Sequence, residues 1–164
     1  MEKKVLPEYS EYYGFLLKYR DELRNVLSNE REKRQSLLDS NMERLEAVLA
    51  LQQAETMKLR QMEDKRIKLQ GALSDGEATA SDFVTTIGDD STKAAFSSII
   101  KEMSELAGEI KEQNSLALEI AKTNLKLIEK IFPANHFDRD KVVYSPDSAK
   151  RSEGPATHSE ELKF

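Results

Sequence analysis

A long apolar stripe at residues 96–131 constrains the fold more than any other feature of this sequence. Apolar or amide side chains recur there every three or four residues, and the pattern ends at Pro133. This spacing is typical of an α-helix with one buried face, and it is kept for about five heptads. We therefore predict a helix over about 92–132 with coiled-coil-like packing. The stripe consists of Phe96, Ile99, Met103, Leu106, Ile110, Gln113, Ala117, Ile120, Asn124, Leu127 and Ile131. A flanking run widens this apolar face: Ile100, Ala107, Asn114, Ala121 and Ile128.

Two more helices are predicted before this one, at about 7–38 and 41–73, each from its own apolar stripe. In the second of them the stripe consists of Leu45, Val48/Leu49, Gln52, Leu59, Met62, Leu69 and Leu73. Asp39, Ser40 and Asn41 interrupt the pattern between them, and such residues favour turns over helix interiors. The alternative is one unbroken helix through both segments, which would need a partner along its whole length. Residues 77–91 are interpreted as a loop with one or two helical turns.

Three helices joined by short loops predict an all-α fold, an elongated antiparallel three-helix bundle in which the last helix protrudes by several turns. Only 6 Gly and 4 Pro in 164 residues, with 34 % charged residues, disfavour a β-sandwich or barrel. We expect residues 1–132 to form the bundle. Residues 133–164 mix Pro, Gly, Ser and charged residues, and we expect them to form a flexible, disordered tail.

Composition also excludes several classes of function. The sequence has no Cys, which rules out disulfide bonds and thiolate zinc sites. It has no basic stripe suited to nucleic acid and no apolar run of about 18 residues, so neither nucleic-acid binding nor membrane insertion is expected. We therefore expect a cytoplasmic protein.

An enzyme is not expected, and neither is a cofactor or a metal. The two histidines, His136 and His158, both lie in the predicted tail, and no phosphate-binding or nucleophile motif is present. Four glutamates on one flank of the last helix are interpreted as a solvated charged face rather than as metal ligands. They are Glu102, Glu105, Glu109 and Glu112.

Polar residues within the long stripe have two interpretations. Gln113, Asn114 and Asn124 could fix the register of the bundle, as a buried Asn does in coiled coils, or could contact a bound peptide. Gly108, in the middle of the same helix, costs about 1 kcal/mol relative to Ala. It either allows another helix to approach closely or is simply tolerated.

The order of these features resembles the flagellar export chaperones of the FlgN type, over residues from about Tyr9 to Ala149. The tail departs from the family pattern, which resembles Tyr-Asp-x-x-Gly. The resemblance is carried by Leu27-Ser-Asn-Glu30, Ser36-Leu37-Leu38, Asp39 in the turn, Leu45-Glu-Ala-Val-Leu49, Gln52-Gln53, Lys65-Arg66, Asn124-Leu-Lys-Leu-Ile128, and Tyr144-Ser-Pro-Asp147-Ser148 in the tail.

This resemblance implies a chaperone that binds the C-terminal helical segments of hook–filament junction (hook-associated) proteins. Such a chaperone prevents their premature assembly and delivers them to the type III export gate. A long apolar helix face suits this role, because it can cover an amphipathic client helix. The candidate client-binding residues are Ile120, Asn124, Leu127 and Ile131, and the candidate docking element in the tail is Val142, Val143 and Tyr144.

Two other functions stay open. The chain could be a structural coiled-coil adapter that acts by self-association, with the same apolar stripe as its seam. A metal-dependent bundle enzyme is a weaker third hypothesis. The sequence does not decide between a monomer and a homo-oligomer.

Overall fold

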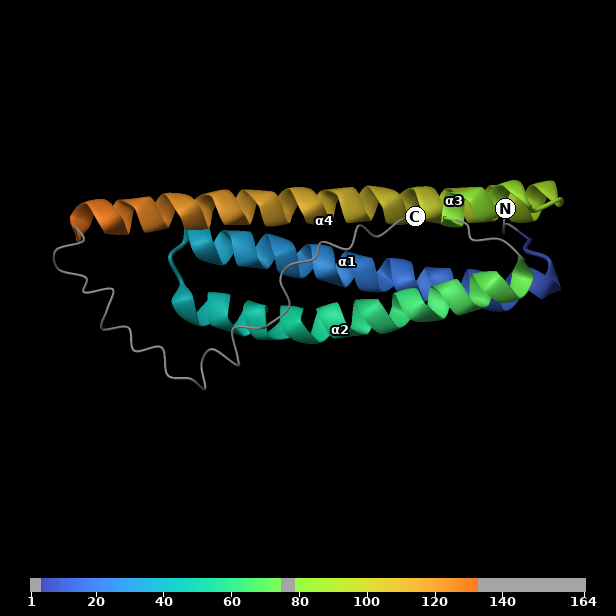
Figure 1. Ribbon diagram of the computed structural model, residues 1–164, viewed down its shortest axis with the longest axis horizontal. Coiled ribbons are helices and arrows are strands. Elements are labelled where there is room, and N and C mark those ends of the chain that lie inside the picture. Colours follow the sequence, from blue (N-terminus) through green and yellow to red (C-terminus); the bar gives the residue numbers. More distant parts are fainter. Residues whose placement is uncertain (1–3, 75–78, 133–164) are drawn as a thin grey trace.

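The structure, a computed structural model, describes residues 4–74 and 79–132, and this part of the chain consists of helices and short connections, without strands (Figure 1). The predicted all-α fold is therefore confirmed. The expected tail, 133–164, lies outside the described residues. The elements are a short 3-10 helix η1 (Pro7–Tyr9) and the α-helices α1 (Ser10–Leu38), α2 (Met42–Leu73), α3 (Ala80–Thr85) and α4 (Asp90–Ile131).

Helix α1 lies between α2 and α4 and packs along both of them (Figure 1). Its side chains pair with α4 residues that are 78, 79 or 81 positions further along the chain, so α1 and α4 run parallel. Its pairs with α2 run in the opposite direction: Tyr12 pairs with Gln70, and Glu30, further along α1, pairs with Gln52, which comes earlier in α2. Helices α1 and α2 are therefore antiparallel. The arrangement is the predicted up-down-up bundle, with α1 as its central helix.

The turn between α1 and α2 breaks the chain where the sequence predicts it. Ser40 has a φ of 52°, in the left-handed region, and Asn41 then caps α2 by accepting a 3.0 Å hydrogen bond from the Arg44 amide. One unbroken helix is therefore ruled out. At the start of α4, Asp89 accepts in the same way from the Thr92 amide at 2.8 Å. This helix begins at Asp90, two residues earlier than predicted.

An aromatic core fills the end of the bundle that carries the start of α1, α3 and the start of α4. The ring of Phe96 lies 5.4–6.0 Å from the rings of Tyr9, Tyr12, Tyr13 and Phe83, within the range of favourable aromatic pairs. The short α3, which the sequence suggests only as one or two helical turns, closes this end. The buried core residues are Tyr12, Phe15, Leu16, Tyr19, Leu23, Ala80, Phe83, Val84, Ile87, Phe96, Ile99, Ile100 and Met103.

The other half of the α1–α2 interface is polar. Within the first half of α2 only Val48 is buried, and Leu49, which the sequence places in the buried stripe, is 45 % exposed. Polar contacts replace apolar ones here, such as Gln52 Nε2 to Glu30 Oε1 at 2.7 Å and Lys58 Nζ to Glu22 Oε2 at 2.6 Å. We call this interface the polar seam; it consists of Glu22, Asn29, Glu30, Gln52, Glu55 and Lys58.

Candidate binding surface at the end of α4

Helix α4 extends well beyond the helices that it packs against (Figure 1). Because α1 and α4 are parallel with a constant offset, the last residue of α1, Leu38, lies level with about Ala117 of α4. Ala117 is also the last buried residue of α4. Residues 118–131 therefore continue past the body of the bundle for about 20 Å, at 1.5 Å per residue. We call this part the projecting end.

The four candidate residues from the sequence all lie on one face at or within this projecting end. Ile120 and Asn124 are half-buried, whereas Leu127 is 52 % exposed and Ile131 is 69 % exposed. The spacing of three and four residues aligns their side chains along the helix, and we call them the first strip. The tail candidates, Val142–Tyr144, lie outside the described residues.

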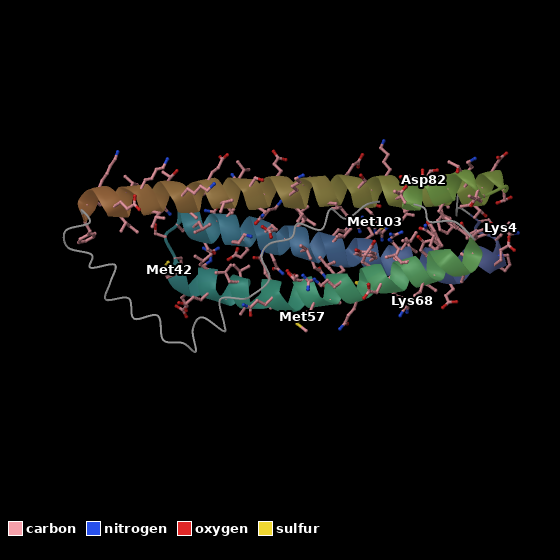
Figure 2. All side chains as sticks on the ribbon, in the orientation of Figure 1. Lys4, Met42, Met57, Lys68, Asp82 and Met103 are labelled. Carbon is pink, nitrogen blue, oxygen red and sulfur yellow. The ribbon has the colours of Figure 1, made fainter. Side chains whose placement is uncertain are left out.

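A second apolar strip runs beside the first, and the sequence-based site prediction omits it. Leu118, Leu125 and Ile128 are 54 %, 57 % and 48 % exposed, and Ala121 is half-buried. Ala121 and Ile128 belong to the flanking run that the sequence indicates, and the i, i+7 spacing of Leu118 and Leu125 could have revealed the other two residues. We call these four residues the second strip. Figure 2 shows the side chains that project from this end of α4.

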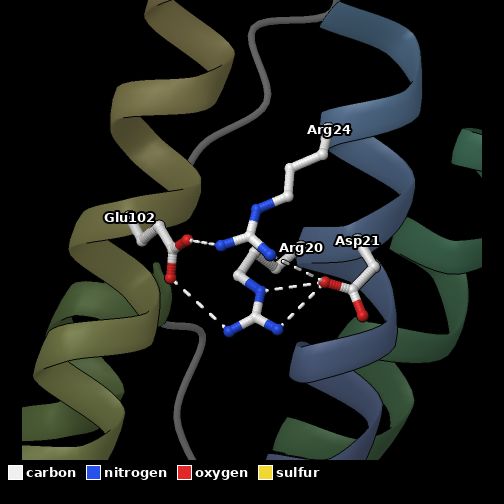
Figure 3. A network of polar contacts seen from close by, with 4 residues as sticks. All are labelled: Arg20, Asp21, Arg24 and Glu102. Atoms are coloured by element: carbon white, nitrogen blue, oxygen red, sulfur yellow. Dashed lines mark hydrogen bonds and ion pairs between the residues drawn. The ribbon is translucent and has the colours of Figure 1, made fainter. Parts of the chain in front are cut away.

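The register of α4 on α1 is fixed by a group of ion pairs along one flank (Figure 3). Glu102 accepts from Arg24, and one of its oxygens lies 3.6 Å from Arg20 Nη1. Asp21 binds the same two arginines from the α1 side, at 2.9 Å and 3.3 Å. These groups are partly or largely exposed, so each pair contributes at most about 1 kcal/mol. Their role is to align the two helices.

The amides within the long stripe take part in the same alignment. Gln113 accepts a 3.0 Å hydrogen bond from Arg34, and Asn114 accepts a 2.9 Å hydrogen bond from Lys33. Both contacts join α4 to α1, which favours the register interpretation for these two residues. Asn124 differs, because it belongs to the projecting end, beyond the reach of α1.

The glutamates of α4 do not assemble a metal site. Glu102 is held by arginines of α1, and Glu109 pairs with Arg31 at 3.0 Å. In the part of the chain that the structure describes, no group of three or more His, Cys, Asp or Glu side chains could hold a metal ion. None of the described helices combines the length and the apolarity that a membrane span requires.

A buried polar cluster joins α1 to the second half of α2. Arg66, only 4 % exposed, donates to Glu63 at 2.7 Å and to Gln70 at 2.8 Å. The hydroxyl of Tyr12 donates to Gln70 at 3.0 Å, and that of Tyr19 donates to Glu63 at 3.3 Å. Burial raises the pKa of both tyrosines. The cluster is therefore a set of neutral hydroxyls and one paired guanidinium, which fits a structural role.

The comparisons with known proteins give one match. A family model described as FlgN protein matches residues 13–152, most of the chain. No curated protein and no solved structure matches this chain. The chain belongs to the FlgN family, a family of flagellar export chaperones.

Proposed function

We propose that this member of the FlgN family is a cytosolic chaperone for hook–filament junction proteins. It binds their C-terminal helical segments, prevents their premature assembly and delivers them to the type III export gate. One observation supports this most: the apolar stripe of α4 continues for about four turns after α1 has ended. A face of this kind suits an amphipathic helix, which lays its apolar side along it.

The first strip is the proposed client-binding surface: Ile120, Asn124, Leu127 and Ile131. Leu127 and Ile131 are its most exposed members, so changing them does not open a cavity in the core. Two aspartates there place charges against the apolar side of a bound helix, where they are costly. We expect the double variant Leu127→Asp/Ile131→Asp to keep its helical circular dichroism and to lose client binding.

The test uses isothermal titration calorimetry with a purified junction protein, full-length and without its C-terminal segment. The matched control, Ser115→Asp/Thr123→Asp, adds the same charge to exposed positions on the other face of α4. Binding is expected for the wild type and the control with the full-length client only. Binding that survives deletion of the client's C-terminal segment would contradict the proposed mode. Loss of helicity in Leu127→Asp/Ile131→Asp would assign those residues to the core.

The tail element Val142, Val143 and Tyr144 is proposed to dock on the export gate. A short apolar cluster in a polar segment suits such a contact. We expect Tyr144→Ala to keep client affinity and to weaken capture by the purified cytoplasmic part of the export gate. Equal capture of the variant and the wild type would contradict this role.

The second candidate function is a coiled-coil adapter that acts by self-association. The exposed apolar strips of α4 favour it too, because two copies could cover each other's projecting ends. Light scattering over a range of concentrations separates the candidates. A stable dimer that does not bind junction proteins supports the adapter, and a monomer that binds them supports the chaperone.

A further inference from the structure

The apolar surface of the projecting end is wider than one partner helix covers. At 3.6 residues per turn, the first and second strips are centred about 110° apart around α4, and together they occupy about half of its circumference. A helix that packs on one neighbour needs an apolar stripe of about 100°. The width of the exposed surface therefore fits two covering helices side by side.

The body of the bundle covers the same two sides of α4. Along the side of the first strip, α4 packs on α1, whose arginines reach Glu102 and Glu109. Near its start α4 also packs on α3, where Phe83 contacts Phe96 with ring centroids 5.7 Å apart. Ile100, on the side that the second strip continues, is only 5 % exposed there. Further along α4, after α3 has ended, α1 reaches this side through Lys33, which donates to Asn114, and Asn114 stays exposed. Near the start of α4, where both α1 and α3 cover it, both sides are buried.

The geometry points to a client that supplies two helices at once, one along each strip. We propose that the projecting end is an incomplete three-helix layer, which two amphipathic helices of one junction protein complete. One of them continues the path of α1 along the first strip, and the other covers Leu118, Ala121, Leu125 and Ile128. This inference rests on the proposed function, since it specifies how the client binds at that surface.

Affinity measurements test separately how much each strip contributes to client binding. In the full chain, Leu118→Asp/Leu125→Asp changes two exposed residues of the second strip, and Leu127→Asp/Ile131→Asp changes two of the first. Each double variant is expected to weaken binding of a full-length junction protein at least about tenfold, which corresponds to about 1.4 kcal/mol. The Ser115→Asp/Thr123→Asp control is expected to bind as the wild type does. Wild-type affinity of the second-strip variant would overturn the two-helix mode.

Photocrosslinking then identifies what lies on each strip. Benzoylphenylalanine replaces Leu125 in one variant and Leu127 in another, and the crosslinked client peptides are mapped by mass spectrometry. We expect two different helical segments of the client, one from each position. The same segment from both positions, or a crosslink from Leu125 to a second copy of this chain, would overturn the inference. A wild-type chain that binds no junction protein at all would instead refute the proposed function.

Discussion

Glu55 carries a negative charge in surroundings that disfavour it. Its Oε1 accepts a hydrogen bond from Asn29, but its buried Oε2 has no hydrogen-bond partner among the described residues. Burial raises the pKa of Glu55; the hydrogen bond from Asn29 opposes this shift, and the nearby charges of Glu22 and Glu30 add to it. The folded protein therefore binds this proton more tightly than the unfolded chain does. Ionisation of Glu55 then destabilises the fold at neutral pH.

Replacing Glu55 by Gln removes this charge and keeps an oxygen that can accept from Asn29. We expect Glu55→Gln to stabilise the protein at pH 7 by up to about 1 kcal/mol, since the site is only partly buried. The gain is expected to shrink as the pH falls towards 4, because the wild-type carboxyl then becomes protonated and neutral as well. Urea unfolding at both pH values measures this.

The exposed Glu112→Gln serves as the control for the loss of one negative charge. It is expected to change the unfolding free energy by less than Glu55→Gln does at pH 7. An equal gain for Glu55→Gln at pH 7 and pH 4 would show that ionisation of Glu55 is not the cause.

At the scale of elements, the apolar face of α4 is well predicted, and Gly108 is a position of low helix propensity within this helix. This residue is exposed, and a Cβ built on it meets nothing within 4 Å in the part of the chain that the structure describes. Close approach of another described helix therefore does not explain the glycine. Its main effect is the conformational freedom that it adds to the unfolded chain.

Gly108→Ala is accordingly expected to stabilise the protein by about 1 kcal/mol. Thermal unfolding followed by circular dichroism measures the resulting rise in Tm. Gly88→Ala is the control, because Gly88 lies between α3 and α4, where helix propensity has no effect. A lower Tm for Gly108→Ala would indicate a close neighbour at this position.

The helices differ in how well their sequences predict which of their residues are buried. The stripe of α4 is strict, and the buried residues Phe96, Ile99, Met103 and Ala117 belong to it, whereas the buried Thr92 and Ala95 do not. In α2 the pattern misplaces Leu49, because the first half of this helix faces the polar seam rather than an apolar core. A contact such as Glu30 with Gln52 depends on how two helices align in space. Neither helix reveals that alignment in its own sequence.

For the whole molecule, the lengths of the helices largely determine the shape. Helices α1 and α2 are similar in length, and α4 is longer, so the end of α4 stays uncovered (Figure 1). The first strip follows from the continuous stripe. Half of the second strip, Ala121 and Ile128, follows from the flanking run of the same helix. Leu118 and Leu125 do not follow from either run, and they widen the exposed surface once α1 has ended. Which side chains of α4 are exposed depends on where the neighbouring helices end in the assembled bundle.

If the projecting end is a binding surface and not part of the core, the body of the bundle will fold without it. None of residues 118–131 is buried, whereas the aromatic core lies at the opposite end of α4. A chain that ends after Ala117 is therefore expected to unfold cooperatively, with a free energy of unfolding within about 1 kcal/mol of that of the full chain. The same truncated chain is expected to bind no junction protein.

A chain that ends after Phe132 is the matched control, because it lacks residues 133–164 but keeps the projecting end. It is expected to retain client binding, so the comparison of the two truncations assigns binding to residues 118–132. Urea unfolding and calorimetric titration of both chains give the two readouts. A marked loss of stability on truncation after Ala117 would show that the projecting end packs into the fold. Client binding by that shorter chain would place the binding surface on the body of the bundle.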